Sequence, residues 1–402
     1  MSTEELSQRD RAAERGLLGG YVDRIRSGEL GGLPVILGII VIWGVFYSQN
    51  DRFLSAFNLT NLALQIAAVG IVSIGVVWVL LLGEIDLAVG SISGLAAAVM
   101  VVMNLDHGVP GWLAILIGLV VGAGIGLLQG LIITQLQVPS FIVTLAGLIG
   151  WQGVLLYTLG EAGTRNITDG TIQSLTDTFF SPAVAWPLTI AFLVVVIALD
   201  HLSRRNRIRA GLEPGSFPGM LLREAIIIVV AIAAVLVFSQ DRGLPLAVLI
   251  LLGLVIVFDL IARRTRFGRH VFAVGGNAEA ARRAGINVAR IRITVFVLSG
   301  AFAAAGGIMA ASRLFAVNQA SGGGNFLLVA IAGAVIGGTS LFGGRGSIYS
   351  ALLGALVIGS VANGIALLGL SSDFEFMITA GVLLAAVVVD ATARRGRQSA
   401  RR

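Results

Sequence analysis

The 402-residue sequence contains no cysteine and no lysine, and it has only three histidines. Without cysteine the chain can form neither disulfides nor thiolate metal sites. Without lysine it lacks the side chain with which a P-loop reaches nucleotide phosphates, and Schiff-base chemistry is excluded for the same reason. His107, His201 and His270 are scattered and match no metal-binding spacing. We therefore expect no enzyme active site, no metal and no cofactor on this chain.

Charged residues are also scarce. They make up 12% of the chain, against 56% hydrophobic residues, whereas an ordinary soluble domain carries roughly 25% charged residues. The apolar residues fall in runs of about 20, the length that an α-helix needs to cross a bilayer. The 53 glycines fit such a chain, because small residues let membrane helices approach closely. The sequence predicts an all-α, polytopic transmembrane helical bundle.

Apolar runs between charged or Gly/Pro breaks predict about twelve spans, with ten to twelve as the range. They lie near 33–48, 62–82, 86–104, 112–135, 140–159, 183–200, 224–240, 244–262, 293–312, 326–341, 348–369 and 375–390. Twelve spans put both ends of the chain on one side of the membrane. Residues 1–30 mix acidic and basic side chains without an apolar segment, so they resemble neither a signal peptide nor a span.

The arginines give the orientation. If the N-terminus is cytoplasmic, 24 of the 28 arginines lie on inside segments, and only Arg52, Arg165, Arg242 and Arg313 lie outside. This distribution follows the positive-inside rule, so we expect both termini in the cytoplasm. The predicted organisation is a cytoplasmic N-terminal tail (1–30), a transmembrane domain (31–391) with a cytoplasmic loop at 263–292, and a basic cytoplasmic C-terminal tail (392–402).

Two carboxylates, Glu84 and Asp86, interrupt a long apolar stretch just before Ser91. Charges inside a membrane are costly, so they usually serve a function or lie at a helix end. The stretch is either a turn between two spans or a break within a helix. Asp86 either caps the following helix at its positive N-terminal end or takes part in solute passage with Glu84 and Ser91. The residues alone leave both alternatives open.

The cytoplasmic stretch from Asn277 to Gly285 predicts a short helix with defined ends. Asn277 suits the N-cap and Glu279 the first turn, and Gly285 suits a left-handed C-terminal cap. Such a helix is too short to be stable alone or to span lipid, so it must dock on something. One alternative is an interfacial helix with arginines near lipid phosphates. The other is a projection that fits a soluble partner.

Two other stretches leave alternatives open. The glycine-rich stretch 336–347, with Thr339 and Ser340, lacks the lysine of a phosphate loop and predicts tight helix packing or a flexible gate. It interrupts an apolar run as 83–91 does, and paired breaks mark the pathway in inverted-repeat transporters. The outside loop 160–182 is polar with few charges, and it is either a surface for another protein or a connector.

Four motifs together resemble the permease subunits of ATP-binding-cassette sugar importers of the ribose and xylose type. They are Gly83-Glu84-Ile85-Asp86-Leu87 with Val89-Gly90-Ser91, the stretch from Val138 to Leu145, the stretch from Gly275 to Val288, and the stretch from Ile336 to Gly346. They run in order over roughly residues 60–390. Additional spans near 183–262 and Glu84, where ribose permeases often have glycine, are similar to the xylose branch.

The resemblance implies a homodimer of permease subunits, a separate ATPase with two fused cassettes that holds ATP and Mg²⁺, and an extracytoplasmic sugar-binding protein. It also implies a multi-pass protein of the bacterial inner membrane that contacts lipid but no nucleic acid. The implied function is alternating-access import of a monosaccharide, xylose or another pentose; an ion-coupled secondary transporter is the alternative. The residues implied to couple to the ATPase are Asn277, Glu279, Ala280, Ala281, Arg282, Arg283 and Gly285, and the expected pathway residues are Glu84, Asp86, Ser91, Thr339 and Ser340.

Overall fold

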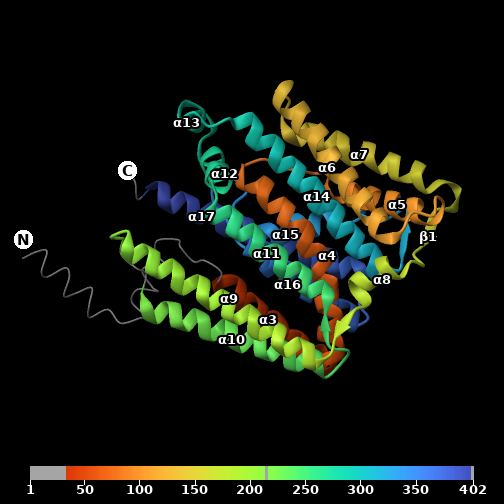
Figure 1. Cartoon of the computed structure of the whole chain (residues 1–402), viewed down its shortest axis with the longest axis horizontal. Coiled ribbons are helices and arrows are strands. Elements are labelled where there is room, and N and C mark those ends of the chain that lie inside the picture. The colour runs from red at the N-terminus through yellow and green to blue at the C-terminus, as the bar shows by residue number, and fades with distance from the viewer. Residues whose placement is uncertain (1–32, 213–215, 400–402) are drawn as a thin grey trace, which may run out of the picture.

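The computed structural model describes residues 33–212 and 216–399, which are mostly helical (Figure 1). The longer helices in chain order are α3 (Leu33–Gln49), α4 (Ala56–Leu81), α5 (Val89–Leu105), α6 (Gly111–Gln135), α7 (Ser140–Leu159), α9 (Pro182–Arg209), α10 (Phe217–Ser239), α11 (Leu246–Arg264), α14 (Val288–Leu314), α15 (Phe326–Ile336), α16 (Tyr349–Leu367) and α17 (Ser372–Ser399). The shorter helices are η1 (Asp51–Leu54), η2 (Gly160–Ala162), α8 (Gly170–Asp177), α12 (Arg266–Gly276) and α13 (Ala278–Arg283). Two small antiparallel sheets pair β1 (Thr164–Asn166) with β4 (Ala316–Asn318) and β2 (Phe179–Phe180) with β3 (Leu244–Pro245).

Each of the twelve predicted spans falls on one of these helices, so the prediction of a polytopic helical bundle is confirmed. Within residues 33–212 and 216–399, eight helices are long and apolar enough to cross a membrane, and three shorter apolar helices accompany them. The span predicted at 326–341 was too long, because α15 ends at Ile336. Gly338 adopts a φ of +107°, which a continuing helix of L-residues does not allow. The predicted tail 1–30 lies outside the described residues.

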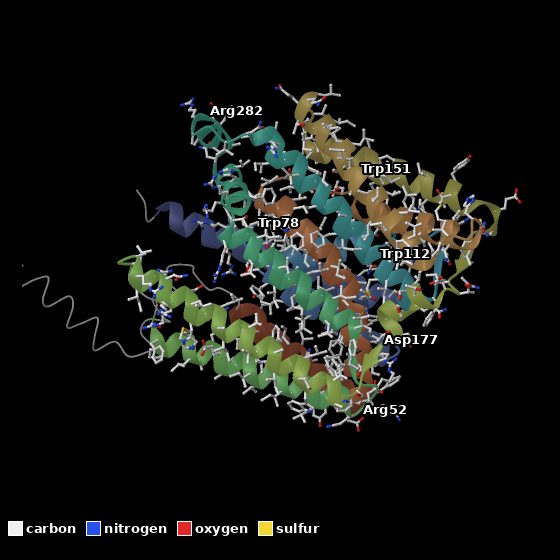
Figure 2. The ribbon with its side chains drawn as sticks, in the orientation of Figure 1. Arg52, Trp78, Trp112, Trp151, Asp177 and Arg282 are labelled. Atoms are coloured by element: carbon white, nitrogen blue, oxygen red, sulfur yellow. The ribbon has the colours of Figure 1, made fainter. Side chains whose placement is uncertain are left out.

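The two ends of the molecule carry different elements. Figure 1 shows α13 at one end and β1 with α8 at the other. Arg282, predicted to be inside, and Arg52, predicted to be outside, lie at these opposite ends (Figure 2). The end of the molecule with α13 is called the inner end below. That it faces the cytoplasm remains a prediction.

The core forms around α4 and α14. Within α4, 89% of the most apolar window is buried, and the Trp78 side chain is 0% exposed. Helix α6 packs tightly on α14 through Gly122 and Gly300, where a Cβ atom on either residue would lie 2.4 Å or 2.1 Å from the carbonyl oxygen of the other. Such small-residue contacts are typical of helices that associate in lipid. The positions of α6 and α14 are thereby fixed against one another.

Three helices lie at the periphery. Only 17% of the most apolar window of α7, 11% of that of α9 and 17% of that of α10 is buried inside the chain. Their apolar surfaces are suited to contact with lipid or with another transmembrane chain, because neither requires polar side chains. The α9–α10 pair is joined near its inner end by His201 with Glu224 (3.4 Å) and by Arg223 with Asp200 (3.4 Å).

The loop 160–182, which is predicted to lie outside, is ordered by Asp169. Its carboxylate accepts hydrogen bonds from the backbone N–H groups of Thr171 (2.8 Å) and Ile172 (3.2 Å) at the start of α8, and from the Asn104 amide (3.2 Å). Burial alone would raise the pKa of Asp169, but these hydrogen bonds outweigh it and hold the pKa below its ordinary value. The ordered loop anchors α8 to the end of α5.

We expect Asp169→Ala to lower the free energy of unfolding by about 1 kcal/mol, because an N-cap and a tertiary hydrogen bond are both lost. A carboxylate whose pKa is lower in the folded state stabilises the fold above its unfolded pKa. That contribution disappears as pH falls through the folded pKa, so the difference between wild type and variant should shrink in acid. Thermal unfolding in detergent at neutral and acidic pH measures both effects. Asp177→Ala, at the other end of α8, is the control and should be neutral or slightly stabilising.

Candidate solute pathway and coupling surface

Residues 82–88 form a non-helical segment between α4 and α5. Glu84 pairs with Arg292 of α14 (2.9 Å), whereas Asp86, two residues later, contacts Ser299 of α14 (2.8 Å). Arg292 and Ser299 are separated by about two helical turns, or roughly 10 Å. The segment therefore runs along α14 from Arg292 to Ser299 and enters the helical bundle before α5 begins.

Asp86 is fully engaged within the protein. It is 4% exposed, and its two carboxylate oxygens accept hydrogen bonds from the Ser299 hydroxyl (2.8 Å) and the Ala88 backbone N–H (3.0 Å). The N-cap of α5 is Ala88, which has no side-chain cap, so Asp86 steadies the start of α5 from two residues before that cap. Glu84 by contrast reaches a hollow at the inner end. The two acids therefore have different environments.

The other predicted pathway residues lie in two places. Ser91 is 0% exposed and donates to the Ala88 carbonyl (3.1 Å) inside the bundle. Thr339 and Ser340 belong to the loop 337–348 that follows α15. The Thr339 hydroxyl is buried and has no hydrogen-bond partner among the described residues, whereas the Ser340 hydroxyl accepts from the Phe342 N–H (3.3 Å). Contact of any of these residues with solute stays a prediction.

The two breaks that the sequence indicates are in direct contact, and α12 packs against both. The Gly344 N–H donates to the Leu81 carbonyl at the end of α4 (2.9 Å). Next to this hydrogen bond lies Gly275 of α12, where a Cβ atom would be 1.8 Å from the Leu81 oxygen and 2.7 Å from the Gly344 nitrogen. We call Leu81, Gly275 and Gly344 the glycine junction. It joins both breaks to the helix that immediately precedes α13.

Helix α13 has the predicted ends. The Asn277 side chain accepts from the Ala280 N–H (2.9 Å), and Gly285 adopts a φ of +84° just after the helix. Glu279 pairs with Arg282 (2.8 Å) and Arg283 (3.1 Å), one turn along. These caps and pairs explain how so short a helix keeps its shape.

Of the predicted coupling residues, only Ala281 is buried, at 5% exposed, so it anchors α13 on its own chain. The others are exposed or at the helix end: Asn277, Glu279, Ala280, Arg282, Arg283 and Gly285. This arrangement leaves a small, charged projection at the inner end of the molecule (Figure 1). A contact of these residues with an ATPase stays a prediction.

Two neighbouring hollows follow the face of α6 and α7. The inner one, about 900 Å³, is polar and is lined by Glu84, Gln137, Ser140, Arg282, Asn287 and Arg292, among others. The second, about 460 Å³, lies between α6 and α7 and is lined mainly by apolar side chains together with Gln129, Gly147 and Trp151. Their lining residues are close in sequence on both helices, since Ile133 and Ser140 line the first while Ile132 and Ile142 line the second.

Gln129 and Trp151 were not predicted from the sequence. Gln129 is 2% exposed, and in the part of the chain that the structure describes neither its amide nitrogen nor its amide oxygen has a hydrogen-bond partner. The buried Trp151 Nε1 lacks one there as well. The signal that could have identified Gln129 is its position as a lone amide in the apolar run 111–133, because polar side chains within spans are costly and often functional. Trp151 gave no such signal.

Comparisons with known proteins identify a consistent set of relatives. The family described as branched-chain amino acid transport system / permease component matches residues 58–387. The xylose transport system permease protein XylH of Escherichia coli is 34% identical over 378 residues, covering 94% of this chain and 95% of the relative. XylH of Haemophilus influenzae is 33% identical, with 92% and 99% covered. The ribose import permease protein RbsC of Bacillus subtilis is 32% identical, with 89% and 92% covered. No solved structure matches the chain.

Proposed function

The chain belongs to the branched-chain amino acid transport system / permease component family, and we propose that it is the transmembrane permease subunit of an ATP-binding-cassette importer for a pentose, with xylose as the first candidate. The observation that carries this proposal is the near full-length similarity to relatives named for xylose and ribose transport. As a permease the chain is a multi-pass inner-membrane transport component. An ion-coupled transporter is not favoured, because Asp86 is held by Ser299 and Ala88, and Glu84 by Arg292.

The importer requires partners that this chain does not supply. An ATPase subunit hydrolyses ATP with Mg²⁺, and an extracytoplasmic binding protein delivers the sugar. We infer that two copies of the permease form the pathway and that the ATPase, with two cassettes, docks on α13 of each copy. The exposed charges of α13 support this, because a capped helix that presents one acidic and two basic side chains at the molecular periphery is suited to a soluble partner.

The glycine junction suggests how ATP hydrolysis reaches the pathway. Helices α12 and α13 meet at Asn277, so a displacement of α13 moves α12 with it. At Gly275 the backbone of α12 presses on Leu81 and Gly344 without an intervening side chain. Closely packed backbones transmit displacement rather than absorbing it, because interiors are dense and poorly compressible. In this mechanism a displacement of α13 moves the segment 82–88. That movement opens the pathway alternately to the two sides of the membrane.

Uptake of labelled xylose by cells that express the complete importer tests the proposal. ATP-driven uptake should depend on this chain, persist when a protonophore collapses the ion gradient, and cease when the partner's nucleotide site is inactivated. The reverse pattern, with uptake abolished by the protonophore and untouched by loss of the ATPase, would establish the ion-coupled alternative. Other pentoses and hexoses, added as competitors, identify the sugar.

Combined substitution of Glu279→Ala and Arg282→Ala should uncouple ATP hydrolysis from uptake without unfolding the chain. The Glu279–Arg282 pair is 57% and 64% exposed, and an exposed pair contributes about 0–1 kcal/mol to stability. We expect xylose uptake to fall about tenfold, which corresponds to roughly 1.4 kcal/mol of lost docking energy. Uptake and sugar-stimulated ATPase activity are measured together. Arg290→Ala, an exposed arginine outside α13, is the control, and unchanged uptake in the double variant would remove α13 from the mechanism.

A further inference from the structure

The hollow between α6 and α7 contains polar groups that the surrounding chain leaves without partners. The two polar atoms of the Gln129 amide and the Trp151 Nε1 are buried and make no hydrogen bond within the described residues. A buried polar group without a partner is strongly unfavourable, and three such groups at one place are unusual in a folded protein. Their presence in an otherwise apolar, membrane-embedded surface calls for a partner that arrives from outside the chain.

Two of these atoms, the Gln129 amide nitrogen and Trp151 Nε1, approach one point beside α7. A Cβ atom on Gly147 of α7 would lie 2.5 Å from the Gln129 amide nitrogen, 3.1 Å from Trp151 Nε1 and 3.2 Å from the Ala88 Cβ. The absence of a side chain at Gly147 therefore lets both nitrogen atoms lie close to the backbone of α7. Ala88 is the N-cap of α5, so this point also adjoins the end of the broken segment.

One stripe of α7 faces the broken segment. Ser140, Thr144, Gly147 and Trp151 follow one another at intervals of three and four residues, which places them on one helix face. The Thr144 hydroxyl lies 3.3 Å from the Ile85 carbonyl within the break. The stripe extends from the polar inner hollow at Ser140 to the second hollow at Trp151. Figure 2 shows Trp151 between the end that carries Arg282 and the opposite end.

We propose that the hollow between α6 and α7 is a binding site for the transported monosaccharide, in which the Gln129 amide and the Trp151 indole N–H hydrogen-bond sugar hydroxyls. This inference rests on the proposed function and names the residues that carry it out. An amide both donates and accepts, and an indole N–H donates, which matches hydroxyl groups that do both. The apolar lining faces the C–H surfaces of the sugar ring. A hollow of about 460 Å³ is within the range of small-molecule sites.

The site binds the sugar weakly and only for part of the transport cycle. The broken segment lies beside this hollow, because Ile85 and Ala88 are close to Thr144 and Gly147 of α7, and its Glu84–Arg292 pair lines the inner hollow. Movement of that segment by α13 would expose the amide and the indole together. The sugar gains their hydrogen bonds while the site is open and loses them when it closes, as import requires.

The test is xylose uptake by the complete importer with Gln129→Leu and Trp151→Phe, each compared with wild type. We expect uptake at limiting sugar to fall about tenfold in each variant, since each removes a hydrogen-bonding group from the site, while Gln129→Leu keeps the side-chain bulk and Trp151→Phe keeps an aromatic ring. Unfolding of the purified chain is measured in parallel. Gln129→Leu should keep or raise the unfolding midpoint, because it removes an unsatisfied amide. If Gln129 served only to stabilise the fold, Gln129→Leu would lower the unfolding midpoint.

The controls separate this inference from the function on which it rests. Gln135→Leu, an exposed glutamine at the end of α6, and Trp112→Phe, which is 62% exposed, repeat the two chemical changes outside the hollow and should leave uptake unchanged. If the Gln129→Leu and Trp151→Phe variants import pentose with ATP as well as wild type does, the proposed sugar site is wrong, whereas the proposed importer function is retained. If wild type moves no pentose, both are wrong. Loss of uptake together with a lowered unfolding midpoint in Gln129→Leu also overturns the site.

Discussion

Gly275→Ala should abolish most sugar uptake, although it adds only one methyl group. The new Cβ would lie 1.8 Å from the Leu81 carbonyl oxygen, a distance that atoms do not tolerate, and the obstacle is backbone that cannot rotate away. Helix α12 must then move off the ends of α4 and of the loop 337–348. Overpacking of this kind typically costs about 1–3 kcal/mol of stability. More importantly, the glycine junction would be held apart, and α13 would lose its contact with the break.

The measurement combines uptake with the integrity of the chain. We expect uptake by the importer to fall more than about tenfold, while the purified chain remains folded with a lower unfolding midpoint, since a cost of 1–3 kcal/mol is less than typical domain stabilities. ATPase activity should persist without responding to sugar.

Gly276→Ala is the matched control for Gly275→Ala. A Cβ on the neighbouring Gly276 meets nothing within 4 Å, so the same substitution one residue later should be neutral. Equal behaviour of the two alanine variants would show that helix propensity, rather than contact at the junction, governs this region.

The features that could be predicted from the sequence are those set by nearby residues. An apolar run of about 20 residues must be helical in lipid, because only internal hydrogen bonding satisfies its backbone. The ends of α13 could be predicted as well, since an N-cap such as Asn277 and a left-handed glycine such as Gly285 act on residues within one turn. These predictions required no knowledge of the contacts between distant segments of the chain.

The parts that could not be predicted depend on contacts between distant segments. The residues around Gly275 do not indicate whether it packs against Leu81 or faces lipid, because glycine occurs in membrane helices at both kinds of position. Gln129 was overlooked because its significance comes from burial against α7, which hydropathy does not reveal. Asp86 could be identified as unusual, but the choice between capping and solute contact needed its partner, Ser299, on a helix far along the chain.

The substitution Asp86→Ala should destabilise the chain severely. It removes the acceptor for the Ser299 hydroxyl and the Ala88 N–H, and Ser299 and Ala88 are both 0% exposed, so water cannot replace the carboxylate. Each buried group left unpaired costs about 1–3 kcal/mol. We expect a large fall in the unfolding midpoint and loss of uptake. Asp86→Ala combined with Ser299→Ala should be no less stable than Asp86→Ala alone, because the orphaned hydroxyl is removed.

The substitution Asp86→Asn asks whether the negative charge itself is needed. An asparagine keeps an oxygen for the Ala88 N–H, and its amide nitrogen can donate to the Ser299 oxygen once that hydroxyl turns. If Asp86 steadies the break, Asp86→Asn should remain folded and import sugar within about twofold of wild type, since both hydrogen bonds survive. Uptake and thermal unfolding are measured on the same preparations. A folded Asp86→Asn chain that imports nothing would mean that the carboxylate acts on solute or a coupled ion. That outcome would return the ion-coupled mechanism to first place, because a group needed only for hydrogen bonding does not require its charge.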